Sequence, residues 1–154
     1  MSAVLKPVPQ FEPMTAADLR SVLDIEQKIY EFPWTLGNFR DSLRAGYSCW
    51  VCRLGGAPIG YAVLMIAAGE AHLLNLSVAP GAQNRGHGRH LLDHVVGVAR
   101  ARGARLLFLE VRPSNDVGRR LYAGYGFGQV GVRRGYYPAK GGGREDALVL
   151  SLSL

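Results

Sequence analysis

The fold of this 154-residue chain is decided by residues 76–89, LSVAPGAQNRGHGR. An apolar strand pattern over residues 71–78 ends inside this stretch, and a helical pattern over residues 88–102 begins at its far end. The helix has one broad apolar stripe, made by Leu91, Leu92, Val95, Val96 and Ala99. Because a compact apolar strand over residues 105–111 follows, the segment predicts a parallel strand pair joined by a right-handed crossover.

Outward from this crossover, the N-terminal half predicts an antiparallel meander and the C-terminal half a helix followed by two strands. The first strand is expected at the edge of the sheet, because its prolines cannot donate to a central ladder. The remaining expected elements are helices at 15–30 (capped by Thr15), 36–44 and 115–123, and strands at 6–12, 48–54, 58–68, 127–134 and 146–152, the last two around a Gly-rich loop at 141–143. Residues 1–154 are therefore expected to form one mixed α/β domain.

Composition excludes several classes of protein. Apolar residues make up 48% of the chain and charged residues 19%, which suits a globular protein with a buried core. The first residues lack the basic and apolar regions of a secretory signal. The longest uncharged run, 54–69, is too short and too rich in glycine to span a membrane. We therefore expect a soluble cytoplasmic protein.

Two motifs resemble metal or redox sites without the geometry for one. Cys49 and Cys52 form a C-x-x-C, but they lie in an expected strand, where residues three apart point to opposite faces. His87, His90 and His94 share one helix face, yet only Asp93 is close by as an acidic partner. No metal site is predicted.

The loop before the central helix has the features of an anion-binding site. Gly86 and Gly88 let the backbone approach a ligand closely, and the first amides of a helix have no partner within the helix. Arg85 and Arg89 add positive charge. Residues 81–154 hold twelve basic and five acidic side chains, whereas residues 1–80 hold six and seven. The chain therefore concentrates its positive charge where this loop lies.

Three polar residues follow at the next strand and helix. Glu110 lies in the apolar run Leu106–Val111, where burial would raise its pKa from about 4.3 toward neutrality and suit a general base. The alternative is a strand-end carboxylate that reaches water or an arginine such as Arg112. Asn115 and Tyr122 lie two helical turns apart on one face, where a helix N-cap and a core aromatic are the structural alternatives.

Taken together, these residues resemble the GNAT superfamily of acetyl-CoA-dependent N-acetyltransferases. Its pyrophosphate-binding motif is similar to Gln83-x-x-Gly86-x-Gly88 after Leu76-Ser77-Val78. The resemblance narrows to the RimI-type ribosomal-protein alanine N-acetyltransferases through four further segments: Phe32-Pro33-Trp34, Leu109-Glu110-Val111-Arg112-x-Ser114-Asn115, Leu121-Tyr122-x-x-Tyr125-Gly126-Phe127, and Arg133-Arg134-Gly135-Tyr136-Tyr137-Pro138 with Gly143-Arg144-Glu145-Asp146-Ala147.

The resemblance implies acetyl transfer from acetyl-CoA to the N-terminal alanine of small-subunit ribosomal protein eighteen, by direct attack in a ternary complex. It implies Glu110 as general base and Tyr122 as general acid toward the CoA thiolate. It assigns the cofactor to Leu76, Ser77, Val78, Asn84, Arg85, Gly86, His87, Gly88, Arg89 and Asn115. It assigns the substrate peptide to Trp34, Arg134, Tyr136 and Tyr137.

Three alternatives remain open on the sequence. The first is a GNAT enzyme for other N-termini, lysine or small amines. The second is a basic RNA-binding module, favoured by the net charge of +6 but not by the pattern, because no basic run exceeds two residues. The third is a catalytically silent acyl-CoA sensor. No membrane or nucleic-acid partner is expected.

Overall fold

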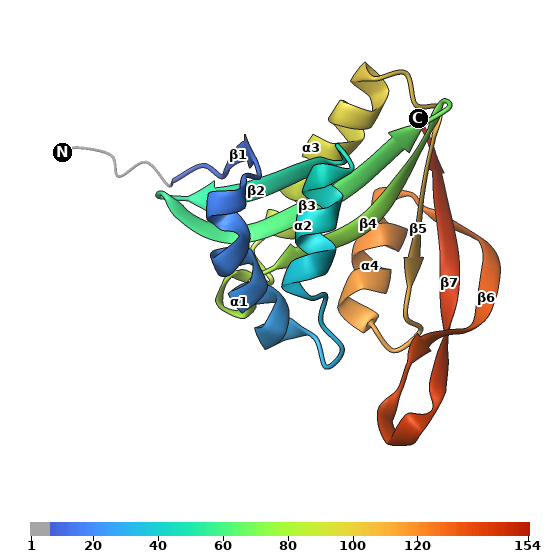
Figure 1. Cartoon of the computed structure of the whole chain (residues 1–154). Coiled ribbons are helices and arrows are strands. Elements are labelled where there is room, and N and C mark those ends of the chain that lie inside the picture. Colours follow the sequence, from blue (N-terminus) through green and yellow to red (C-terminus); the bar gives the residue numbers. More distant parts are fainter. Residues whose placement is uncertain (1–6) are drawn as a thin grey trace.

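The computed structural model describes residues 7–154, in which helices pack on both faces of a single twisted sheet (Figure 1). The sheet has seven strands in the order β1-β2-β3-β4-β5-β7-β6. The strands are β1 Gln10–Pro13, β2 Ser48–Leu54, β3 Ala57–Ala67, β4 Glu70–Val78, β5 Leu106–Val111, β6 Gly128–Pro138 and β7 Arg144–Ser153. The α-helices are α1 Leu19–Ile29, α2 Leu36–Arg44, α3 His87–Ala101 and α4 Asp116–Tyr125, with short 3-10 turns at Ala16–Asp18, Pro80–Ala82 and Lys140–Gly142.

The predicted mixed topology is confirmed. Strands β1 to β4 form an antiparallel meander, β4 and β5 are parallel with α3 as their crossover, and β5, β7 and β6 are antiparallel. The parallel pairing is short, from Glu70 opposite Leu106 to Leu73 opposite Leu109. A register shift between β3 and β4 occurs at Val63/Leu64, just where β4 leaves β5. Beyond it, the two strand ends diverge and leave an opening in the middle of the sheet.

Two apolar clusters cover the two faces of the sheet. One packs α3 and α4 against residues such as Leu73, Leu107 and Leu109, and the other packs α1 and α2 against Val51, Tyr61 and Val63. Cys52 belongs to the first cluster and Cys49 to the second, so the two thiols point to opposite faces as predicted. Burial raises the pKa of each thiol to about 11.

The sequence prediction was wrong about some strand limits. The first strand is an edge strand but starts at Gln10, and Lys6, which the prediction included, lies outside the described residues. The last two strands are longer than predicted because the pairing resumes after a bulge between Arg133 and Tyr137. At this bulge Gly135 adopts φ +57°, and its amide donates to Asp146 Oδ1 at 2.8 Å. The resulting β6–β7 hairpin projects past the end of the sheet (Figure 1).

Candidate active site

The loop between β4 and α3 forms a cradle of free backbone amides. Gly86 caps α3 with φ +83°, and Asn84 also has a positive φ, of +61°. Among the described residues, no backbone acceptor meets the amides from Gln83 to Arg89. The Gln83 side chain donates to Val78 O at 3.0 Å and holds the loop to the end of β4. Free amides at a helix N-terminus favour an anion, so the loop has the backbone geometry that the predicted anion site requires, and the site itself stays a prediction.

Side chains of this loop are divided between solvent and core. Arg85 is exposed, and the Arg89 guanidinium lies 5.3 Å from the centre of the Tyr125 ring, whose hydroxyl donates to Asp93 Oδ1. His87 is only 9% exposed. It therefore offers its backbone amide rather than its ring to the cradle. Gly88 packs against α4, because a Cβ there would lie 3.4 Å from Leu121 Cδ2.

Glu110 lies at the opening, on the sheet face that α1 and α2 cover. Its side chain is 6% exposed, and Oε2 accepts a hydrogen bond from His72 Nε2 at 2.5 Å. Arg133 Nε is 3.1 Å from Oε1, an ion pair whose alignment leaves Oε1 without a hydrogen bond. The expected partner Arg112 does not contact this carboxylate; it pairs with Glu145 instead. One carboxylate oxygen is thus anchored while the other keeps a free lone pair.

The expectation of a raised pKa for Glu110 was wrong. Burial alone would raise it, but the hydrogen bond from His72 and the charges of His72 and Arg133 outweigh burial and hold the pKa below its ordinary value. Neither partner was identified from the sequence, because they come from β4 and β6. His72 is further fixed by stacking on Phe108, with ring centres 4.3 Å apart.

Tyr122 and Asn115 come from α4 and its N-cap, on the other face of the sheet. Tyr122 is 8% exposed and packs edge-on against Phe127, and burial, together with the neighbouring Tyr30 and Tyr137, raises its pKa. Asn115 is the helix N-cap, and its Oδ1 accepts from Gly118 N at 2.9 Å. Its Nδ2 has no hydrogen-bond partner within residues 7–154, so the cap leaves one donor for a ligand.

A buried carboxylate that the sequence analysis did not single out lies beneath the opening. Glu26 of α1 is 2% exposed and accepts hydrogen bonds from Tyr61 Oη, Asn75 Nδ2 and the Trp34 amide, at 2.7 to 2.9 Å. Asn75 Oδ1 accepts from Ser77, whose Oγ is 2.6 Å from the Tyr30 hydroxyl. This series of hydrogen bonds links α1 to the end of β4 that is not paired with β5.

The residues predicted to bind peptide divide between the α1–α2 connection and the β6–β7 hairpin. The Trp34 ring packs on Phe39 at 5.1 Å, whereas Tyr136 is 44% exposed and packs edge-on against Tyr137. Burial and the charge of the Glu110 carboxylate raise the pKa of Tyr137. Arg134 extends into solvent with Asp146 Oδ2 at 3.7 Å, so it is the least fixed of the four.

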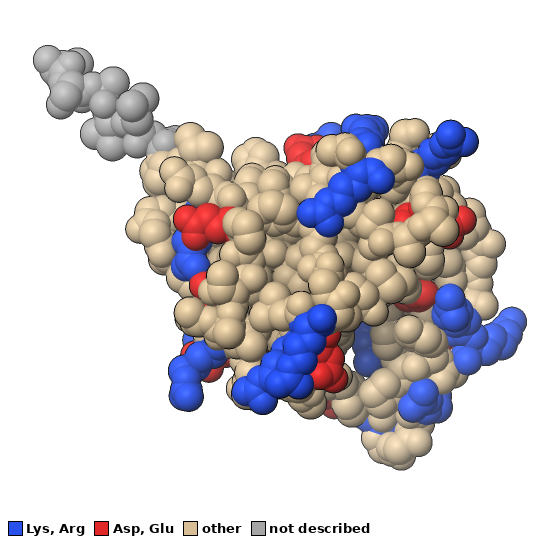
Figure 2. Space-filling view, turned by 45° about the horizontal axis from the view of Figure 1, so that its top comes forward, with Lys and Arg blue, Asp and Glu red and all other residues tan. Residues whose placement is uncertain are grey.

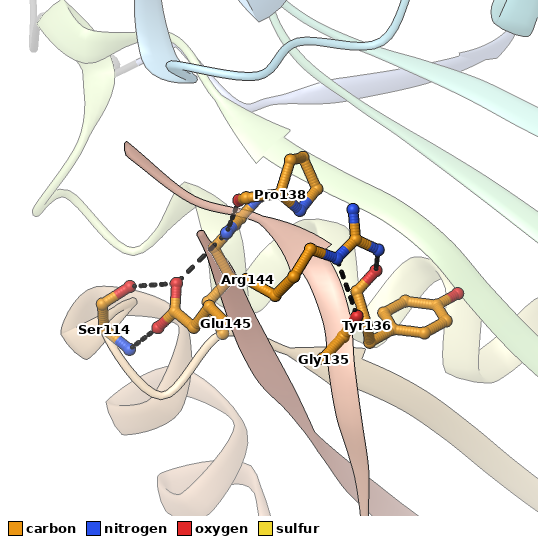
Figure 3. A network of polar contacts seen from close by, with 7 residues as sticks. Ser114, Gly135, Tyr136, Pro138, Arg144 and Glu145 are labelled. Atoms are coloured by element: carbon orange, nitrogen blue, oxygen red, sulfur yellow. Dashed lines mark hydrogen bonds and ion pairs between the residues drawn. The ribbon is translucent and has the colours of Figure 1, made fainter. Parts of the chain in front are cut away.

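Polar contacts hold the hairpin against the start of α4. Glu145 accepts from both the amide and the hydroxyl of Ser114 at 3.0 Å, and Arg144 donates to the carbonyls of Gly135 and Tyr136 across the bulge (Figure 3). These contacts therefore hold in place the hairpin that carries Tyr136 and Tyr137.

The charge distribution, the possible metal ligands and the helices of residues 7–154 bear on other kinds of function. On the face that Figure 2 shows, basic side chains lie in separate groups beside acidic ones around a largely uncharged centre. Within residues 7–154, no group of three or more His, Cys, Asp or Glu side chains is arranged to hold a metal ion. In the same range, none of the helices combines the length and apolar character that a membrane crossing requires.

Comparison with known proteins identifies the family to which this chain belongs. The model of the acetyltransferase (GNAT) family matches residues 19–127, and the chain belongs to this family. It is 35% identical to the ribosomal protein bS18-alanine N-acetyltransferase of Escherichia coli, over 92% of this chain and 95% of that protein. It is 34% identical to the protein of the same name from Haemophilus ducreyi, over 93% and 99%.

Solved structures agree with the sequence comparison. The crystal structure of the ribosomal-protein-S18-alanine N-acetyltransferase from Escherichia coli matches with a TM-score of 0.87 and 34% identity, over 95% of this chain and 94% of that one. Ard1 from Thermoplasma volcanium matches with a TM-score of 0.86 over 95% and 97%, and at 24% identity it supports the fold alone.

Proposed function

We propose that this chain, acting as a single cytoplasmic domain, transfers an acetyl group from acetyl-CoA to the N-terminal alanine of ribosomal protein bS18. The observation that carries the proposal is the opening between β4 and β5. Glu110, a buried carboxylate, lies just past the last β4–β5 pair on one face of the sheet, and Tyr122, a buried phenol, belongs to the apolar cluster on the other face. The identity with relatives named for this reaction, over nearly their whole length, supports the same substrate.

The residues around the opening fit acetyl-CoA, which supplies the acetyl thioester. The free amides of residues 83–89, with Arg85 and Arg89, suit its pyrophosphate. Leu76, Ser77 and Val78 form the part of β4 that has left β5, so their backbone groups on that side, apart from the Val78 carbonyl that Gln83 occupies, are free to bind the pantetheine arm. The free Nδ2 of Asn115 adds a donor at the same edge.

Glu110 would orient and deprotonate the attacking amine, directly or through water. An α-amine has a pKa of about 7.7–8.0, so a substantial fraction is already neutral near pH 7 and a weak base suffices. The lowered pKa of Glu110 is compatible with this task, because it keeps the carboxylate ionised at every pH at which the amine is reactive. Oε1, which is buried and accepts no hydrogen bond, keeps a lone pair for the amine or for a water that relays its proton.

Tyr122 would protonate the departing thiolate. Its raised pKa keeps the phenol protonated throughout the neutral range, so it holds a proton to donate to the thiolate as the C–S bond breaks, which gives the free thiol of CoA. Cys49 and Cys52 are buried in the two apolar clusters, away from the opening, so the chain offers no thiol for a covalent acetyl intermediate there. Direct attack by the amine is the consistent route.

A panel of peptides tests the proposal. The purified protein is incubated with acetyl-CoA and peptides that begin with the bS18 sequence, with its alanine replaced by serine or methionine, or with a blocked N-terminus and an internal lysine. Mass spectrometry should locate the acetyl group on the α-amine of the alanine peptide, with the highest kcat/KM of the set. Preference for the lysine peptide, or no turnover of any α-amine, would refute it.

A further inference from the structure

Arg112 follows directly on β5, two residues after Glu110, and has no role in the proposed chemistry. Its side chain is 26% exposed, and its Nη1 donates to Pro138 O at 2.8 Å and to Glu145 Oε1 at 3.1 Å. Its guanidinium also lies 4.3 Å from the centre of the Tyr137 ring and 5.5 Å from that of Phe32. One side chain thus contacts both the β6–β7 hairpin and the connection between α1 and α2.

These two segments border the route to Glu110. The α1–α2 connection begins at Tyr30, whose hydroxyl bonds Ser77 on the free end of β4. The hairpin carries Tyr137 and also Arg133, whose Nε lies 3.1 Å from Glu110 Oε1. Both segments lie at the same end of the sheet (Figure 1). A peptide that delivers its amine to Glu110 from this end of the sheet would pass between them, over Arg112.

We propose that Arg112 is a positioning residue for the substrate peptide. It fixes the separation between Phe32 of the α1–α2 connection and Tyr137 of the hairpin, so that the space between them stays fitted to the first residues of the peptide. This inference rests on the proposed function, because it assumes that the acceptor is a peptide N-terminus.

The chemistry of the guanidinium suits this role. It is planar, so both of its faces can stack on aromatic rings while its edge donates hydrogen bonds, and it stays charged at every relevant pH. Glu145 and the Pro138 carbonyl accept the hydrogen bonds of Nη1, and Ser114 holds Glu145 from the other side (Figure 3). With Nη1 bonded to the hairpin and its faces toward Phe32 and Tyr137, Arg112 acts as a brace between these two segments.

The test compares steady-state kinetics of the bS18 peptide for wild type and Arg112→Ala. Removing the brace should raise the peptide KM roughly ten-fold while kcat changes less than two-fold, because binding common to the ground and transition states is lost. The KM for acetyl-CoA should stay within two-fold. Arg119→Ala is the matched control, since Arg119 also donates to a proline carbonyl, Pro113 O at 3.1 Å, but from α4.

A second variant keeps the test decisive if Arg112→Ala is poorly folded. Phe32 is 41% exposed, so Phe32→Ala should fold. It should raise the peptide KM about three-fold, because it removes the ring on which Arg112 packs. The double variant should be no worse than Arg112→Ala, because both changes release one contact.

The outcomes separate the two proposals. If wild type does not acetylate the peptide, the proposed function falls and this inference with it. If wild type is active but both single variants keep the peptide KM within two-fold, the positioning role alone is overturned. A parallel loss of kcat and of folded protein in Phe32→Ala, with its KM unchanged, would also overturn it.

Discussion

Replacing Glu110 by glutamine removes the candidate base while keeping its shape. The change costs some stability, because the hydrogen bond with His72 loses its charge and Arg133 loses its anionic partner. Gln keeps an acceptor for His72, and the Arg133 side chain is 53% exposed and weakly held. We therefore expect a loss of about 1–2 kcal/mol in the free energy of unfolding. For a chain of this length, that lowers Tm by roughly 2–8 °C.

The expected loss of activity is far larger. A positioned general base contributes roughly 10²–10⁴-fold to the rate, which is about 2.7–5.4 kcal/mol of barrier. A domain with ordinary stability of about 5–15 kcal/mol remains folded at 25 °C after losing 1–2 kcal/mol. Unfolding therefore cannot account for a hundred-fold loss. The assay follows release of the CoA thiol with the bS18 peptide, alongside thermal unfolding of the same sample.

The reasoning about Glu110 fails if the glutamine variant keeps kcat/KM within about five-fold of wild type. The pH dependence of stability gives an independent check. Because folding lowers the pKa of Glu110, its ionisation stabilises the fold above the ordinary value of 4.5, and this contribution is lost as pH falls through the lower folded value. The stability gap between wild type and variant should therefore be full at pH 7 and close progressively below pH 4.5. A gap that stays constant to low pH would contradict the assigned interactions.

Three other changes have distinct expected effects. Tyr122→Phe should lower kcat roughly 10²-fold or more with the acetyl-CoA KM nearly unchanged. In the wild type, ionisation of this phenol should cause no fall in rate up to pH 9, which stopped-flow assays over a range of pH would measure. Gly86→Ala forces a side chain into φ +83° and should cost about 1–2 kcal/mol and raise the acetyl-CoA KM several-fold, measured by urea unfolding and by titration. Glu26→Gln leaves three donors with a single acceptor oxygen in a buried site, so urea unfolding should show a loss of about 2–4 kcal/mol; a loss below about 0.5 kcal/mol would disprove the network.

The sequence predicted the architecture because its central segment is locally consistent. Strand, glycine-rich loop, amphipathic helix and strand follow in an order that permits few topologies. The hairpin β6–β7 was harder to predict, since Arg133-Arg134-Gly135 has the composition of a strand end. Only the Asp146 side chain, bonded to the Gly135 amide, shows how the ladder continues past the bulge.

The candidate site was partly predictable for a similar reason. Glu110 can be recognised in the sequence because it is a single charged residue in an apolar strand. Its partners His72 and Arg133 cannot, because only the pairing of the sheet brings them to it. Their effect reversed the expected direction of its pKa shift. Glu26 could have been found, because it occupies a position on the apolar stripe of its helix, four residues after Val22. An acidic residue there requires several hydrogen-bond donors nearby.

The division of the apolar residues between the two sheet faces has a consequence for the order of folding. Every member of the cluster under α1 and α2 comes from residues 14–79, whereas the cluster under α3 and α4 draws on residues up to Leu154. During synthesis, which proceeds from the N-terminus, the first cluster can assemble before the second half of the chain exists. The strand β4 would then wait with one edge unpaired until β5 emerges. A nascent chain stopped shortly after Ala79 should therefore already protect Val22 and Tyr61 from solvent, while the edge that later pairs with Leu106–Leu109 remains open.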